Sequence, residues 1–163
     1  IREVEGDAED IPKVNFGIYR SSKEYDLPAS KESSLGGTSV RSIVNRPYTL
    51  GQVVDLISKF FEEFPRDESL LAQSAYWMRW FAGMHFFEDA NHRTGMSTLR
   101  ITMENNRMDP PEELRSLEDA SDFSRTAIDA SKEVREHVEV DSSNMYEEDD
   151  LYEVWYRYFE ELL

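Results

Sequence analysis

Apolar residues recur at three- and four-residue spacing between Thr49 and Pro65, in a stretch that is otherwise polar. This spacing is typical of one face of an amphipathic helix, and the proline predicts where that helix stops. A second stretch, over 70–82, has the same periodicity but is apolar on nearly all sides, so we expect a central, buried helix there. Its aromatic side chains are expected in the core and not in base stacking: Tyr76, Trp77, Trp80 and Phe81.

The second half of the chain predicts further helices. A new helical face opens at Met96 and ends near 105–106, where two asparagines precede paired prolines. Beyond the prolines, helical periodicity covers 114–117, 123–138 and 149–163. The last helix follows an acidic run, which matches the positive end of its dipole.

The N-terminal third carries weaker signals. Residues 1–37 are polar and broken by proline and glycine, which predicts loops with at most a small β-hairpin. A short helix could begin at Thr38 or Ser39 and end before Pro47, although a strand through the same β-branched residues fits almost as well. We therefore expect one all-α domain over 1–163, with a loop-rich segment 1–37 and a helical core 38–163.

Composition and charge exclude several classes of protein. The 163 residues contain no cysteine, so neither a disulfide framework nor a thiolate metal site is available. The 34 acidic and 18 basic residues give a net charge of −16, which disfavours binding to nucleic acid or anionic membrane. No apolar run is long enough to span a membrane and the acidic start resembles no signal peptide, so a cytoplasmic location is expected.

The acidic residues are spread along the whole chain, and arginine outnumbers lysine by 13 to 5. We interpret this surface as an adaptation to high salt, where screening shortens the reach of charge repulsion. The alternative is an ordinary acidic protein, whose melting temperature would not rise between low and molar salt.

Candidate chemistry gathers in the polar stretch between the second and third predicted helices. Ala90 and Asn91 lie where the third helix begins, so backbone N–H groups and the positive dipole end would face an anion there. Arg93, on the first turn, adds a guanidinium suited to phosphate oxygens. Asp89 supplies a carboxylate that could hold Mg²⁺ against the same phosphates, and His85 could accept a proton from a hydroxyl.

This segment resembles the signature of the Fic/Doc family, which reads His-Pro/x-Phe-x-Asp/Glu-Gly/Ala-Asn-Gly/Lys-Arg. Every restricted position but one is matched, by His85, Phe87, Asp89, Ala90, Asn91 and Arg93. The resemblance covers 38–163 and implies a compact Fic/Doc-type helical domain in which a central helix-loop-helix carries the signature. It implies transfer of part of a nucleotide, from ATP or another nucleoside triphosphate with Mg²⁺, onto a protein hydroxyl.

The resemblance also implies a role for each matched residue. His85 would be the general base on the target hydroxyl, and Asp89 would be the Mg²⁺ ligand. Asn91 and Arg93 would contact the nucleotide phosphates, beside the backbone at Ala90. Phe87 would be an anchor that is packed in the core and holds the loop in shape.

Two departures from the family pattern matter. His92 stands where most members have glycine or lysine, and it could either add a pH-dependent phosphate contact or fill space. Members that transfer AMP usually carry a second arginine three residues after the first, but this chain has Met96 there, and Arg100 is too far along the helix to replace it. The Doc branch also lacks that arginine, has alanine where this chain has Ala90, and resembles phosphotransferases that act on a translation factor; a separate antitoxin protein is the expected regulator.

We therefore expect transfer of phosphate to a Ser or Thr hydroxyl of a target protein, by the toxin of a toxin–antitoxin pair. AMP transfer to a protein hydroxyl and a non-catalytic nucleotide- or partner-binding module are the alternatives. A third interpretation is a transition-metal site, because His85, Asp89 and His92 would share one face of a continuous helix.

Overall fold

The computed structural model describes residues 1, 48–87, 90–115 and 122–163, and these residues confirm the all-α class. In chain order the helices are α2 (Leu50–Glu62), α3 (Leu70–Met84), α4 (Asn91–Asn105), α5 (Glu112–Arg115), α6 (Asp122–Val134) and α7 (Asp150–Leu162). The helix or strand expected over 38–47 and the N-terminal hairpin lie outside the described residues.

The helices begin where the sequence supplies capping side chains. Thr49 and Gln52 form a capping box at the start of α2, in which each side chain bonds the other residue's backbone N–H. Ser69 caps α3, and the Asp149 carboxylate caps α7 by accepting from the backbone N–H groups of Leu151 and Tyr152. These polar residues stand directly before apolar periodic stretches, which is why the predicted starts hold to within a residue.

One predicted helix was too long. The helix expected over 123–138 ends at Val134, and the next residues continue in turns whose backbone N–H groups bond three residues back, such as His137 to Val134. Val138 follows Val134 at helical spacing, so the apolar pattern continued past the point where the backbone leaves the helix. Short turns of this kind are common at helix ends and periodicity does not detect them.

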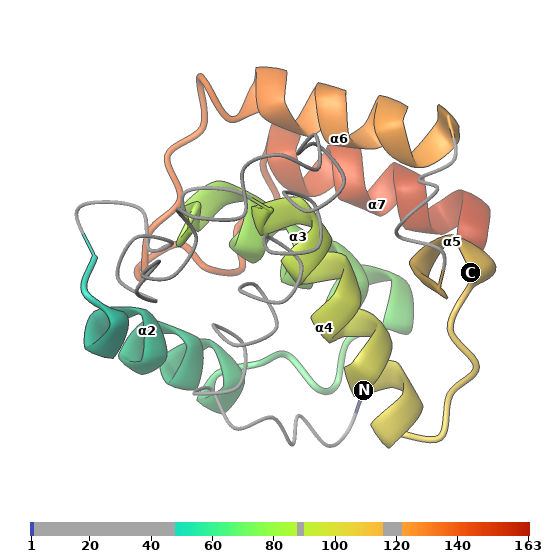
Figure 1. Ribbon diagram of the computed structural model, residues 1–163, viewed down its shortest axis with the longest axis horizontal. Coiled ribbons are helices and arrows are strands. Elements are labelled where there is room, and N and C mark those ends of the chain that lie inside the picture. The colour runs from blue at the N-terminus through green and yellow to red at the C-terminus, as the bar shows by residue number, and fades with distance from the viewer. Residues whose placement is uncertain (2–47, 88–89, 116–121) are drawn as a thin grey trace, which may run out of the picture.

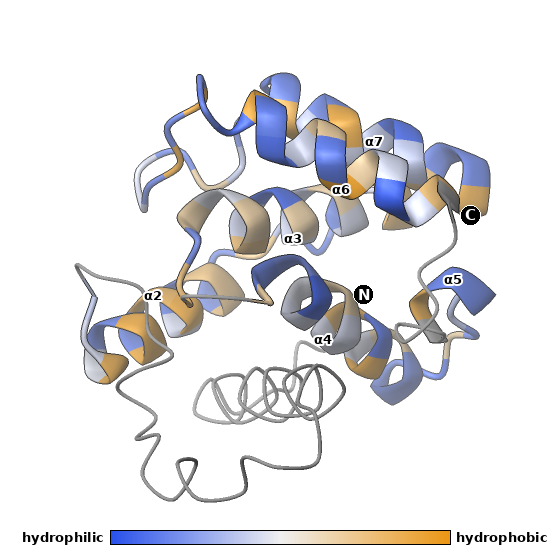
Figure 2. Cartoon of the chain, turned by 45° about the horizontal axis from the view of Figure 1, so that its top comes forward, coloured by the Kyte–Doolittle hydropathy of each residue, from blue (hydrophilic) through white to orange (hydrophobic). Residues whose placement is uncertain are grey.

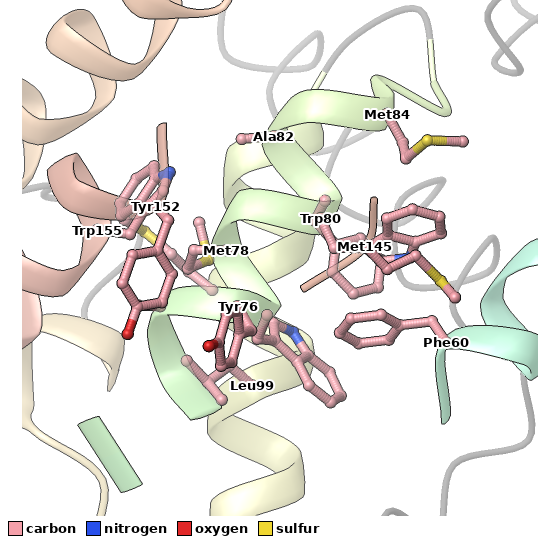
Figure 3. Close-up of a cluster of buried hydrophobic side chains, with 14 of the residues drawn as sticks. Phe60, Tyr76, Met78, Trp80, Ala82, Met84, Leu99, Met145, Tyr152 and Trp155 are labelled. Atoms are coloured by element: carbon pink, nitrogen blue, oxygen red, sulfur yellow. The ribbon is translucent and has the colours of Figure 1, made fainter. Parts of the chain in front are cut away.

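Helix α3 is the centre of the molecule, with α7 packed along one side and α4 crossing another (Figure 1). Trp77, Trp80 and Phe81 are fully buried, as expected for core residues. Figure 3 shows side chains from the other helices meeting α3 from several directions. The stacked pair of Phe60 and Trp80, with ring centroids 5.3 Å apart, joins α2 to α3.

The close contact between α3 and α4 fixes the relative position of the two helices that flank the candidate site. A Cβ atom at Gly95 would lie 3.0 Å from Phe81 Cβ and 3.1 Å from Met78 Sδ, so a larger residue would require these neighbours to shift by a few tenths of an ångström. The indole of Trp77 donates to the carbonyl of Gly95 at 3.0 Å. The first turns of α4 are therefore held against α3 by both packing and a buried hydrogen bond.

A buried ion pair joins α3 to the start of α7. The guanidinium of Arg79, which has no exposed surface, bonds both carboxylate oxygens of Asp149 at 2.6 and 3.0 Å. It also donates to the carbonyls of Asn144 and Met145. Arg79 thus fixes the loop before α7 as well as the helix itself.

Hydropathy follows this packing. Figure 2 shows hydrophilic residues along the outer sides of α6 and α7 and on the first turn of α4, with apolar residues concentrated where the helices meet. Within the described ranges, no helix is both long enough and apolar enough to cross a membrane.

Candidate functional site

The candidate base His85 ends α3 in a left-handed backbone conformation. Helix α3 stops at Met84, and His85 has φ 48° and ψ 52°. This conformation turns the chain away from the helix axis and is uncommon for a residue with a Cβ atom. The side chain is half-buried at the point where the polar loop begins.

Ala90 closes the same loop in a second left-handed conformation. It has φ 63° and ψ 19° and immediately precedes α4. Within the described part of the chain, the non-glycine residues with positive φ are His85, Ala90 and Arg107, so two of the three flank this loop. Backbone strain is kept where the surrounding structure imposes it, and it concentrates at functional sites. Ala90 avoids only the larger cost that a β-branched or bulky side chain would meet in this conformation.

Asn91 holds the loop by clamping the backbone of Phe87. Its Oδ1 accepts from the Phe87 N–H at 2.9 Å, and its Nδ2 donates to the Phe87 carbonyl at 2.6 Å. The side chain is 3% exposed. Its amide therefore acts here as a loop clamp, and the expected phosphate contact stays a prediction.

The clamp makes a test with defined chemistry possible. In Asn91→Asp the carboxylate can still accept from the Phe87 N–H but cannot donate to its carbonyl. We expect a loss of about 1–3 kcal/mol in the free energy of unfolding, measured by urea denaturation. The control Asn105→Asp makes the same change at an exposed position of α4, and equal losses in both variants would contradict the clamp.

Both aromatic residues of the segment are buried. Phe87 is 1% exposed, and Phe86 is fully buried against Trp80 and Phe81 of α3. Phe87 therefore lies in the core, where an anchor would have to lie. Phe86 was not among the predicted site residues, because the family signature leaves its position open. Its apolar character was the available signal.

His92 lies against the C-terminal helices. Its Nε2 is 3.0 Å from the hydroxyl of Ser131 on α6, and its ring packs against Trp155 of α7. Burial lowers the pKa of His92 to about 4, and the positive charges of Arg135 and Lys132 add to this effect. A neutral, buried imidazole fits the space-filling alternative better than the phosphate contact.

The low pKa of His92 predicts a pH dependence of stability. Unfolding returns the imidazole to its ordinary pKa of about 6.5, so the unfolded chain binds more protons between pH 6.5 and 4. The stability associated with neutral His92 is complete above pH 6.5 and is lost as the pH falls to about 4, by about 3 kcal/mol.

Urea unfolding between pH 7 and 4.5 would measure this effect. Wild-type stability should fall more steeply with acid than that of His92→Gln, which has no group titrating there. The variant His137→Gln, at an exposed histidine, should keep the wild-type slope. Identical slopes for wild type and His92→Gln would show that His92 is not held neutral.

Helix α4 begins directly after Ala90, whose side chain has no polar group to cap it. The first helical bond runs from the Thr94 N–H to the Ala90 carbonyl at 2.8 Å. The first turn therefore directs N–H groups and the positive dipole end toward the loop, and half-buried Arg93 lies on that turn. This geometry suits a phosphate group.

The predicted Mg²⁺ site and the predicted transition-metal site have different outcomes. Asp89, the expected Mg²⁺ ligand, lies outside the described residues. The transition-metal interpretation required a continuous helix through 85–92, and this was wrong because α3 ends before His85 and α4 begins at Asn91. Across the ranges that the structure describes, no group of three His, Asp or Glu side chains is placed to hold a metal ion.

The structure thus places His85 at the end of α3 and Ala90, Asn91 and Arg93 at the start of α4, while His92 contacts Ser131 of α6. Comparison with known proteins adds no relative to this picture. No protein-family model, no curated protein and no solved structure matches the chain.

Proposed function

We propose that this chain is a Doc-like transferase that moves the terminal phosphate of ATP to a Ser or Thr hydroxyl of a target protein. The observation that carries the proposal is that the base candidate His85 ends α3 and that α4 begins directly after Ala90, so the short segment between them separates a histidine from a helix N-terminus. The resemblance of this segment to the Fic/Doc signature supports group transfer from a nucleotide to a hydroxyl as the reaction of this site. A separate antitoxin protein is the proposed regulator.

The reaction would proceed by in-line displacement. His85 accepts the proton of the target hydroxyl as its oxygen bonds to the γ-phosphorus, and the bond from that phosphorus to the bridging oxygen breaks to release ADP. Arg93 and the first turn of α4 stabilise the charge that develops on the phosphate oxygens. Mg²⁺, for which Asp89 is the proposed ligand, would supply further positive charge.

Burial at Met96 supports phosphate transfer over AMP transfer. The Met96 side chain is 1% exposed and belongs to the core cluster. An arginine at this position would bring an unpaired guanidinium into the core, so this chain does not use the position for a second phosphate contact. Arg93 is the guanidinium on the first turn of α4 and Met96 stands in place of a second one, so we assign the terminal phosphate to the site near His85.

The experiment that tests the proposal compares two labels. The protein is incubated with a cell extract and Mg²⁺ plus either γ-labelled or α-labelled ATP. Label reaching a protein band from γ-labelled ATP alone is the expected result. Label from α-labelled ATP alone would establish AMP transfer, and nucleotide binding without any transfer would favour the non-catalytic binding module.

A further inference from the structure

The C-terminal end of α6 brings an arginine to the start of α4. The contact between the two helices is the 3.0 Å pair of His92 Nε2 and the hydroxyl of Ser131, which is fully buried. Arg135 follows Ser131 by four residues, and its backbone N–H still bonds the Ser131 carbonyl at 3.1 Å. This helical bond keeps Arg135, the residue after α6, on the same face as Ser131, which is the side of α6 that contacts α4.

Electrostatics agree with this placement. After burial, the charge of Arg135 is the largest cause of the lowered pKa of His92, followed by Lys132 and then His85. Arg135 and the candidate base therefore both act on one buried imidazole. That imidazole adjoins Arg93 in the chain, so Arg135 lies near the first turn of α4, which carries Arg93.

In the described part of the chain, the Arg135 side chain also forms no ion pair with a carboxylate. Lys132, one turn earlier, is exposed and lies 2.9 Å from Asp129. Arg79, Arg100 and Arg157 likewise pair with acidic side chains. Arg135 is half-buried and has no ion pair with a described residue, although the chain has 34 acidic residues for 18 basic ones. A guanidinium kept free of carboxylates is suited to an external anion.

We propose that Arg135 is a phosphate-binding residue of the site, adding a guanidinium from the end of α6 to that of Arg93 on α4. The inference rests on the proposed function and adds a residue and a ligand preference to it. The ligand is a nucleoside triphosphate with Mg²⁺, since two arginines on separate helices are matched to more than one phosphate group. A nucleoside monophosphate, with a single phosphate, would gain little from Arg135.

The test uses the intact chain and measures the affinities of ATP with Mg²⁺ and of AMP by calorimetry. Arg135→Gln should weaken ATP binding by about 10- to 100-fold, the range expected when a charged hydrogen bond is removed. AMP affinity and the melting temperature should change little. Arg125→Gln, which removes the same charge from an exposed position of α6, should leave ATP affinity within twofold.

The outcomes separate this inference from the function on which it rests. Wild-type protein that binds no ATP would overturn the proposed function itself. Wild-type binding with equal ATP affinities in Arg135→Gln and Arg125→Gln would overturn only the role of Arg135. If Arg135→Gln lowers the melting temperature, Arg135→Lys decides the matter, because the retained charge should recover part of the ATP affinity and no recovery would contradict the proposal.

Discussion

Replacing His85 by alanine should lower the rate of phosphate transfer by about 10²- to 10⁴-fold, the usual contribution of a general base. ATP affinity should stay nearly unchanged, because the base acts on the target hydroxyl in the chemical step and contributes little to ground-state binding. Stability should also change little. His85 is half-buried, and alanine meets a similar cost in the left-handed conformation that the loop imposes.

Two further variants, at His85 and at His137, serve as controls for the His85→Ala result. His85→Asn keeps a polar side chain, tolerates the left-handed backbone better and cannot act as a base at neutral pH, so it should be as inactive as His85→Ala. His137→Ala removes an exposed histidine and should keep full activity. Transfer at the wild-type rate in both His85 variants, with γ-label still reaching the target, would remove histidine from the mechanism.

The parts of the fold that could be predicted are the helices whose position and burial are set by residues within or next to the helix itself. Helix α2 was predicted because its apolar face repeats every three or four residues and ends at Pro65. The burial of α3 followed from a stretch that is apolar on nearly all sides, and the start of α7 from its acidic entry. Each of these signals lies within the element that it predicts.

The parts that could not be predicted depend on partners far apart in the chain. His92 bonds Ser131, 39 residues away, and nothing in the neighbourhood of either residue indicates the pair. The Asn91 clamp lies within four residues of Phe87, but it requires the backbone turns at His85 and Ala90, which neither periodicity nor propensity predicts for non-glycine residues. The sequence therefore named the site residues, but it could not predict which contacts each of them makes in the folded chain.

The buried pair of Arg79 and Asp149 is another such contact, and its members are 70 positions apart in the chain. Arg79 lies in a helix that was predicted to be central and buried, and it is itself fully buried. Partial burial of Asp149 works to raise the pKa of its carboxyl, but the bonds from Arg79 and from the start of α7 hold that pKa below its usual range. The native structure therefore favours the ionised pair over either charge alone.

Asp149→Ala should consequently lower the free energy of unfolding by about 3–5 kcal/mol, the cost of leaving a buried charge without its partner. The Arg79 guanidinium would keep only its bonds to the carbonyls of Asn144 and Met145, and α7 would lose its cap. Urea denaturation measures the loss. Asp150→Ala, at the exposed neighbouring position, should cost less than about 1 kcal/mol.

A double variant separates the ion pair from the helix cap. Arg79→Met removes the buried charge, so adding it to Asp149→Ala should recover part of the lost stability, although Arg79→Met alone should be destabilising. The cap remains absent in the double variant, so about 1 kcal/mol of the loss should persist. A loss in Asp149→Ala no larger than in Asp150→Ala, or strictly additive losses in the double variant, would mean that the pair does not hold α3 to α7 in solution.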